Sequence, residues 1–222
     1  SDAPKQLEAA LQAHPRVHSI DLSHCQLNEI PKSIGLAIGL KVLKIGMNPL
    51  ETDALRALSG LTTLETLIVN KTQLKHWPSP LGALNQLETL DLTDNQLKEW
   101  PALSAGNCQN LKALRLYGNS INQADSPPRS LPKLEELSLG SSKRNLAALC
   151  DGYFSQMRTL KSLRIWGALK SLPSSLKSLV ALTDLDLRGN PLNNKSWPLI
   201  CSLLALEELH LQESQISDIP DS

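Results

Sequence analysis

Few side chains of this sequence occur in patterns that could support catalysis or bind a metal ion. The five histidines do not show the spacing of a metal site, and there is no Cys-x-x-Cys pair, glycine-rich phosphate loop or nucleophile elbow. Asp184 and Asp186 fall on one face of an expected strand, where paired acids are usually just solvated. We therefore expect no enzymatic activity within these residues, and no metal ion or cofactor.

A repeated pattern sets where each side chain lies. The pattern L-x-x-L-x-L-x-x-N-x-L-x-x-L-P has its cleanest copy at residues 87–101. Its first apolar position recurs at intervals of 22 to 26 residues, a regularity that composition alone does not produce. The nine copies begin at Val17, Leu40, Leu64, Leu87, Leu111, Leu134, Leu160, Leu182 and Leu206.

Each copy predicts one short strand followed by a turn. Leucines alternate with polar residues, as in LETLDL at residues 87–92, which is the period of a strand with one buried face. Parallel strands stacked at roughly 4.8 Å bury one another's leucines. After the strand, an amide can donate to and accept from the backbone groups that the turn frees. The asparagines at this position are Asn48, Asn95, Asn119 and Asn190.

In six copies a large apolar residue precedes a proline, as in Trp100-Pro101, and proline favours extended geometry there. With this turn, residues 17–220 resemble the leucine-rich-repeat family, in particular its 23-residue class. The resemblance implies an α/β fold: a right-handed, curved solenoid with a parallel concave sheet and irregular, 3-10 or helical segments on the convex side. It also implies a partner protein, because the class is common in bacterial secreted effectors and intracellular scaffolds.

The chain divides into a short cap and one solenoid. Residues 1–16 are expected to form an N-terminal capping helix, because Leu7 and Leu11 share a helical face that ends at His14-Pro15. Residues 17–222 are expected to form about nine repeats. No capping segment is recognised after Pro220, so we expect the natural protein to be longer.

The four cysteines are expected to stay reduced. They fall in repeats one, four, six and eight, and most pairs therefore lie near or beyond the roughly 7 Å that a disulfide can bridge. Extracellular members of the family usually carry cysteines clustered in their caps, which this sequence lacks. We expect a cytoplasmic or other reducing compartment, or the host-cell cytosol for a secreted bacterial effector. The cysteines are Cys25, Cys108, Cys150 and Cys201.

Exposed strand residues form columns across the repeats, and repeats five to eight carry the distinctive ones. Two aromatic residues lie two strands apart, about 10 Å, with Gly140 between them. We predict a slot with aromatic walls, a glycine floor and arginines at its edges, which receives an apolar or acidic side chain of a partner. The predicted partner-binding residues are Tyr117, Trp166, Arg188, Arg164 and Arg115.

One alternative to this interpretation stays open. Trp166 could instead stack on Arg188 as a stable surface pair, which leaves no slot. The small residues of the next column are interpreted as keeping the surface low beside the aromatic residues; they are Gly118, Ser141, Gly167 and Gly189.

The charge balance limits the partners. Lys plus Arg and Asp plus Glu both number 22, so no net field attracts nucleic acid or an acidic membrane. The longest apolar run is too short to cross a bilayer. We predict a monomeric protein-recognition module, the targeting arm of a larger protein such as a bacterial effector. The alternatives are a substrate-recognition domain of an enzyme, such as a ubiquitin ligase with its catalytic domain outside this chain, and a structural spacer or adhesion domain.

Overall fold

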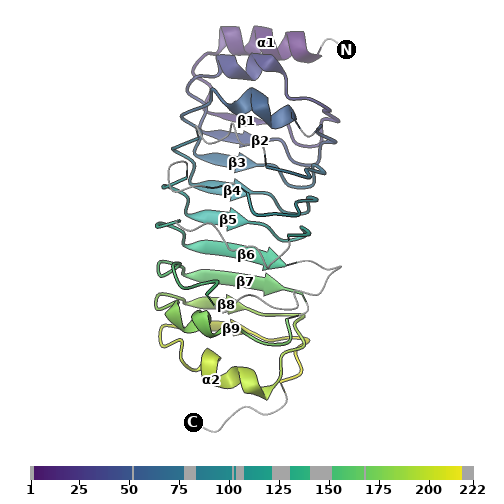
Figure 1. Ribbon diagram of the computed structural model, residues 1–222. Coiled ribbons are helices and arrows are strands. Elements are labelled where there is room, and N and C mark those ends of the chain that lie inside the picture. Colours follow the sequence, from purple (N-terminus) through teal and green to yellow (C-terminus); the bar gives the residue numbers. More distant parts are fainter. Residues whose placement is uncertain are drawn as a thin grey trace.

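A computed structural model describes residues 3–51, 53–77, 84–101, 103, 108–121, 131–140, 152–167 and 169–216 of the chain. Nine strands form one open parallel sheet in which chain order is also spatial order (Figure 1). They are β1 (Ser19–Asp21), β2 (Val42–Lys44), β3 (Thr66–Ile68), β4 (Thr89–Asp91), β5 (Ala113–Arg115), β6 (Glu136–Gly140), β7 (Ser162–Trp166), β8 (Asp184–Asp186) and β9 (Glu208–His210).

The strands pair without any shift in register. The central leucine of each strand lies opposite the central leucine of the next, from Leu43 and Leu67 through to Leu185 and Leu209. The residue after it pairs in the same way along the whole sheet, beginning with Asp21 opposite Lys44. The predicted solenoid and the alignment of this column are therefore confirmed, but Ser138 and Asp186 of the column are buried, not exposed.

The repeated leucines form one continuous core. The first leucine of each of the seven repeats from the second to the eighth is fully buried, as Leu64 and Leu134 illustrate. Side chains from the opposite side of the solenoid complete this core: Phe154 is fully buried and Tyr153 contacts both Phe154 and Trp100, with ring centroids 5.1 and 5.8 Å apart. Trp77 and Trp197, each followed by a proline, are partly buried against the same core.

Buried asparagines link neighbouring repeats where the chain leaves each strand. Asn95 shows the arrangement: its Nδ2 donates to the carbonyl oxygens of Val69 and Leu92 at 2.8 and 3.0 Å. Its Oδ1 accepts from the backbone N–H groups of Thr72 and Leu74 at 3.1 and 3.0 Å. One amide thus satisfies backbone groups in its own repeat and in the preceding one, as its position in the pattern predicts.

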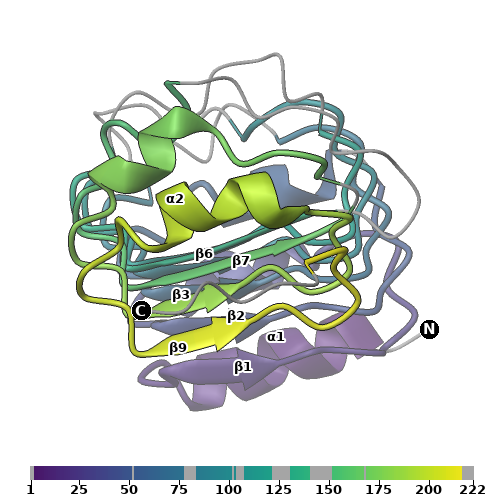
Figure 2. The same ribbon diagram turned by 90° about the horizontal axis from the view of Figure 1, so that it is seen from below.

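The side opposite the sheet carries short helical segments. Looking along the stack, Figure 2 places the strands on one side of the solenoid and α2 with the connecting segments on the other. Pro31 and Pro173 have extended backbone and each immediately precedes a 3-10 helix. These segments are η1 (Lys32–Leu36), η2 (Ala54–Leu58), η4 (Ser174–Ser178), η5 (Asn194–Ser196) and α2 (Trp197–Ile200).

The two ends of the stack differ. Helix α1 (Ala3–Ala13) lies at the β1 end (Figure 1), with Leu11 buried and Leu7 packed against the core. At the β9 end, Leu206 and Leu209 are only partly buried, whereas their counterparts one repeat earlier are fully buried. Among the described residues, no helix has the length and apolar character that crossing a membrane requires.

Candidate partner-binding face

The face of the sheet opposite the core, called the open face below, carries all five residues predicted to bind a partner. Arg115 lies in β5, and Arg164 and Trp166 lie in β7. Tyr117 and Arg188 each follow a strand by two positions, after β5 and β8. Because these residues alternate with buried leucines, the strands direct them all to the same side.

The prediction of a slot between the two aromatic residues is wrong. The rings of Tyr117 and Trp166 meet edge to face, with centroids 4.8 Å apart and an interplanar angle of 82°. Their strands are separated by β6, but Gly140 of that strand has no side chain to hold the rings apart. The two rings therefore lean together across Gly140 and fill the predicted gap, in the geometry that aromatic pairs prefer.

Gly140 is required by the close approach of the next strand. It pairs with Trp166, and its φ of +123° is in the region that favours glycine. A Cβ at this position would lie 1.7 Å from the carbonyl oxygen of Trp166. This glycine therefore fixes the backbone under the aromatic pair and also leaves the space that the rings occupy.

The other glycines of the predicted low surface have a different explanation. Gly118 and Gly189 have φ values of +76° and +70°. Non-glycine residues at the same place in other repeats, such as Met47 and Asp94, also have positive φ, at +55° and +54°. The turn after the strand takes a left-handed residue in each of these repeats, a conformation that glycine adopts without strain, so Gly118 and Gly189 do not by themselves indicate a binding surface.

Arg188 is held between an aromatic ring and a buried acid. Its Cζ lies 5.4 Å from the centroid of the Trp166 ring, so the stacking that the sequence left open is present. Its Nε and Nη2 also donate to both oxygens of Asp186, at 2.9 and 2.6 Å. The Asp186 side chain is only 2 % exposed. The guanidinium is therefore fixed in one orientation while its outer part stays accessible.

Asp186 is charged in this environment. Burial raises the pKa of its carboxyl group, but hydrogen bonds from the side chain and backbone of Arg188, together with the nearness of the Trp166 indole N–H, outweigh burial and bring the pKa below its ordinary value of 3.8. The Trp166 Nε1 is buried near this carboxylate without reaching hydrogen-bond geometry. Asp186 thus serves as the fixed anion on which Arg188 is oriented.

A second set of ion pairs covers β5 to β8. Arg115 donates through Nε and Nη2 to both oxygens of Glu136, each at 2.9 Å, and this contact raises the pKa of the arginine. Arg164 lies between two acids, with nitrogen–oxygen distances of 3.6 Å to Glu136 and 3.5 Å to Asp184. Ser162 also donates to Asp184 at 2.7 Å. All three predicted arginines therefore have carboxylate partners within the chain.

The sequence interpretation missed Glu136 and its place between two arginines. The column of residues before the central leucine also lies on the open face, because the same strand period places it there. In that column Glu136 of β6 lies beside Ala113 on one side and Ser162 on the other. Reading every outward position of each strand, and not only those after the central leucine, identifies it.

The described cysteines form no disulfide. Cys25 and Cys201 are exposed and Cys108 is buried, and all three are free thiols. Burial raises the pKa of the Cys108 thiol to about 11, so it stays protonated at neutral pH. Cys150 lies outside the described residues.

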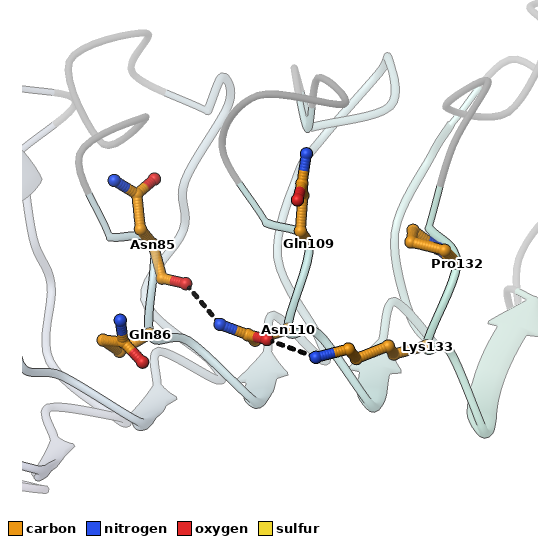
Figure 3. Close-up of a pocket in the computed structure, with 6 residues that line it drawn as sticks. All are labelled: Asn85, Gln86, Gln109, Asn110, Pro132 and Lys133. Carbon is orange, nitrogen blue, oxygen red and sulfur yellow. Dashed lines mark hydrogen bonds between the residues drawn. The ribbon is translucent and has the colours of Figure 1, made fainter.

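A shallow polar groove lies at the end of the sheet where the strands begin, apart from the predicted residues. Its volume is about 310 Å³. Figure 3 shows the residues that line it, which come from neighbouring repeats. Asn110 donates to the backbone carbonyl of Asn85 at 2.9 Å and accepts from Lys133 at 2.7 Å (Figure 3). These hydrogen bonds join the repeats to one another, which favours a structural role for these two contacts.

Comparisons with known proteins agree with this architecture. A model of the leucine-rich repeat matches residues 16–36, and no curated protein matches the chain. An internalin from Listeria monocytogenes has a TM-score of 0.71 at 24 % identity over 91 % of this chain and 56 % of that chain. A leucine-rich-repeat protein of Leptospira interrogans has a TM-score of 0.69 at 25 % identity over 96 % of this chain and 59 % of that chain.

A plant structure is also similar. It is the leucine-rich-repeat ectodomain of the membrane receptor kinase GASSHO1/SCHENGEN3 from Arabidopsis thaliana, solved in complex with CASPARIAN STRIP INTEGRITY FACTOR 2. Its TM-score is 0.65 at 28 % identity, over 90 % of this chain and 24 % of that chain. The chain therefore spans less than two thirds of each of these three structures. The in-register repeats, the family match over residues 16–36 and the structural neighbours together show that this chain has the leucine-rich-repeat fold.

Proposed function

We propose that the chain is a recognition module that binds a partner protein through the open face of β5 to β8. The observation that carries this proposal is the cluster of Tyr117, Trp166 and Arg188, whose side chains are partly or largely exposed yet fixed by one another and by Asp186. Tyrosine, tryptophan and arginine are the residue types most often found where binding energy is concentrated in protein interfaces. A surface that is already ordered also loses little conformational entropy on binding.

The ion pairs indicate which side chain of a partner this surface suits. An acidic side chain would have to compete with Glu136 and Asp186 for arginines that are already paired. An apolar side chain can instead pack on the exposed edges of Tyr117 and Trp166 without breaking any of these contacts. We therefore favour an apolar contact at the aromatic pair, framed by Arg115 and Arg188, over the acidic one that the sequence also allowed.

The comparisons support a protein or peptide partner and no catalytic role for these residues. The similar plant ectodomain was solved with a protein factor bound. We further propose that the module is the targeting arm of a larger protein, such as a bacterial effector. The support is that the chain spans 56 % and 59 % of two bacterial proteins of the same fold. The free thiols of Cys25, Cys108 and Cys201 suit the reducing compartment proposed for it.

The test is affinity capture with the chain and two double variants. The first, Trp166→Ala with Arg188→Ala, removes the cluster from repeats seven and eight. The second, Asn70→Ala with Thr93→Ala, changes the same column of the open face in repeats three and four and serves as the matched control. We expect the first variant to lose at least about tenfold in partner affinity and the control to bind as the unmodified chain does.

Folding is checked in parallel by circular dichroism and urea unfolding. The single variant Arg188→Ala keeps the aromatic pair in place. A loss of partner affinity in this variant therefore does not come from disturbing the sheet at Trp166. A folded Trp166→Ala, Arg188→Ala variant that retains full affinity would show that the partner does not use this face.

A further inference from the structure

Three side chains at the β9 end of the open face converge in a way that the partner-binding proposal does not use. Asp184 of β8 lies directly opposite Glu208 of β9, and His210 is two residues further along β9 on the same face. One ligand atom from each of the three lies within 4.8 Å of the others. The cluster combines two carboxylates with one imidazole.

The carboxylate of Asp184 is oriented by neighbours on the preceding strand. Its Oδ2 accepts a hydrogen bond from Ser162 at 2.7 Å and a longer contact from Arg164 at 3.5 Å. Both donors engage the same oxygen, which leaves Oδ1 for another ligand. Hydrogen bonds of this kind hold metal-binding side chains in the orientation that the ion requires.

The charge balance of the open face also favours a cation here. From β5 to β8 the charges alternate, with Arg115, Glu136, Arg164 and Asp184 in sequence, so each acid has an arginine beside it. Glu208 of β9 follows Asp184 in this series, and no arginine pairs with it among the described residues. Its ion-pair partner in the described part of the chain is His210, with Nε2 and Oε2 3.8 Å apart, and an imidazole is charged only when protonated. Acids directly opposite on neighbouring strands otherwise repel each other.

We propose that Asp184, Glu208 and His210 bind a divalent transition-metal ion such as Zn²⁺. An imidazole and two carboxylates suit this class of ion, while Ca²⁺ and Mg²⁺ prefer oxygen ligands alone. Three ligands leave at least one coordination position open to water. The ion would join β8 to β9 and would thereby hold the terminal strand on the sheet.

The chain provides its own matched control. His76 and Glu99 also form a histidine–carboxylate pair, with Nδ1 and Oε1 3.5 Å apart, but no third ligand completes a group with them among the described residues. If any exposed histidine beside an acid were enough to bind the ion weakly, both His76 and His210 would take part in binding. A site that needs three converging ligands would occur only at His210.

The experiment is a calorimetric titration with ZnCl2. Cys25 and Cys201 are first replaced by serine, since exposed thiols bind Zn²⁺ themselves, and Cys150, outside the described residues, is replaced with them; Cys108 is buried and is kept. We expect one ion per chain and a higher Tm in its presence. The substitutions His210→Ala and Asp184→Asn should each lower the affinity at least about tenfold, and Asn keeps the oxygen that Ser162 contacts. The control His76→Ala should bind as the background does.

The same titration can overturn the proposal. It is wrong if Zn²⁺ at millimolar concentration gives neither binding heat nor a change in Tm. It is also wrong if the His210→Ala variant keeps the affinity of the background, or if His76→Ala loses as much as His210→Ala. Circular dichroism of each variant without metal shows that a loss of affinity does not come from unfolding.

Discussion

The open face of this solenoid has two halves that share a backbone and differ in their side chains. Strands β2 to β4 present mainly small or aliphatic residues, such as Val42 and Thr89, beside the charged Lys44 and Asp91, and the ion pair of Lys44 with Asp21 is exposed and 3.8 Å long. Strands β5 to β8 present bidentate and shared ion pairs and an aromatic pair. Both halves pair strand to strand in one unbroken register.

This difference shows where the repeat constrains the sequence and where it does not. Buried leucines and the turn asparagines are the same in both halves because the core and the backbone hydrogen bonds require them. Outward residues are free of those requirements. A dense network such as Arg115–Glu136–Arg164 is therefore a property of one half of the face alone, and the proposed function is assigned to that half.

The largest expected effect on stability is the difference between alanine substitutions at two glycines of one column, Gly140 and Gly46. In Gly140→Ala the new methyl group would meet the Trp166 backbone at a positive φ, so we expect a loss of about 3 kcal/mol in the free energy of unfolding. In Gly46→Ala the nearest atom, 2.0 Å from the new Cβ, is the Asn70 side-chain oxygen, which can rotate away. We expect a loss of about 1 kcal/mol there.

Urea unfolding of the two variants measures this difference. The near-ultraviolet circular dichroism of Gly140→Ala should also change, because Tyr117 and Trp166 are moved apart. Equal losses for the two variants would mean that the strand approach at Gly140 is no tighter than elsewhere in the sheet.

The sequence predicted the fold and the column of each residue because both follow from the buried period. The predicted placement of Arg115 and Trp166 on the open face is therefore correct. The contacts between side chains were not predictable in the same way. The length and freedom of a side chain decide whether it spans a gap: Tyr117 and Trp166 meet across Gly140 with ring centroids 4.8 Å apart, where strand spacing alone predicts a gap of about 10 Å. Likewise, the positive φ of Met47 shows that the turn itself takes a left-handed residue, which the glycines at this position do not reveal.

The next largest effect on stability is expected at Asp186 in β8, and Asp21 in β1, an acid of the same column, serves for comparison. The pKa of Asp186 lies below its unfolded value of 3.8, so the charged group stabilises the fold above that pH, and this stability is lost as pH falls through the lower folded pKa. We expect Asp186→Asn to lower the free energy of unfolding by about 2 kcal/mol at neutral pH, with the difference from the unmodified chain shrinking in acid.

Asp21 provides the exposed counterpart. Its pKa is lowered mainly by the backbone N–H of Ser23, and the group is exposed to solvent. Asp21→Asn should therefore have a smaller effect at neutral pH, with the same sign of pH dependence. Thermal unfolding of both variants from neutral pH to below pH 3.8 checks this, and an Asp186→Asn variant that follows the unmodified chain at every pH would remove the role given to this ion pair.

The aromatic contact is expected to contribute less than the buried acid. A double-mutant cycle with Tyr117→Leu and Trp166→Leu isolates the interaction between the rings from the loss of each ring alone. Edge-to-face pairs contribute about 1 kcal/mol beyond the area they bury. Urea unfolding of the four proteins gives the coupling energy. A value of zero would indicate that the two rings share the space above Gly140 without attracting each other.

The smallest expected effect distinguishes the ion pairs of the two halves. Arg115 and Glu136 are partly buried and bidentate, whereas Lys44 and Asp21 are exposed and 3.8 Å apart. Fixed, two-point geometry reduces the entropy that a surface pair must lose, and partial burial reduces its screening by salt. Alanine cycles should therefore give a coupling of about 0.5 kcal/mol for the first pair and none measurable for the second. The coupling at Arg115 should persist in 0.5 M NaCl. If both couplings disappear together as salt is added, the network on β5 to β8 is an ordinary solvated surface, and the rigidity on which the proposed interface depends is not provided by its ion pairs.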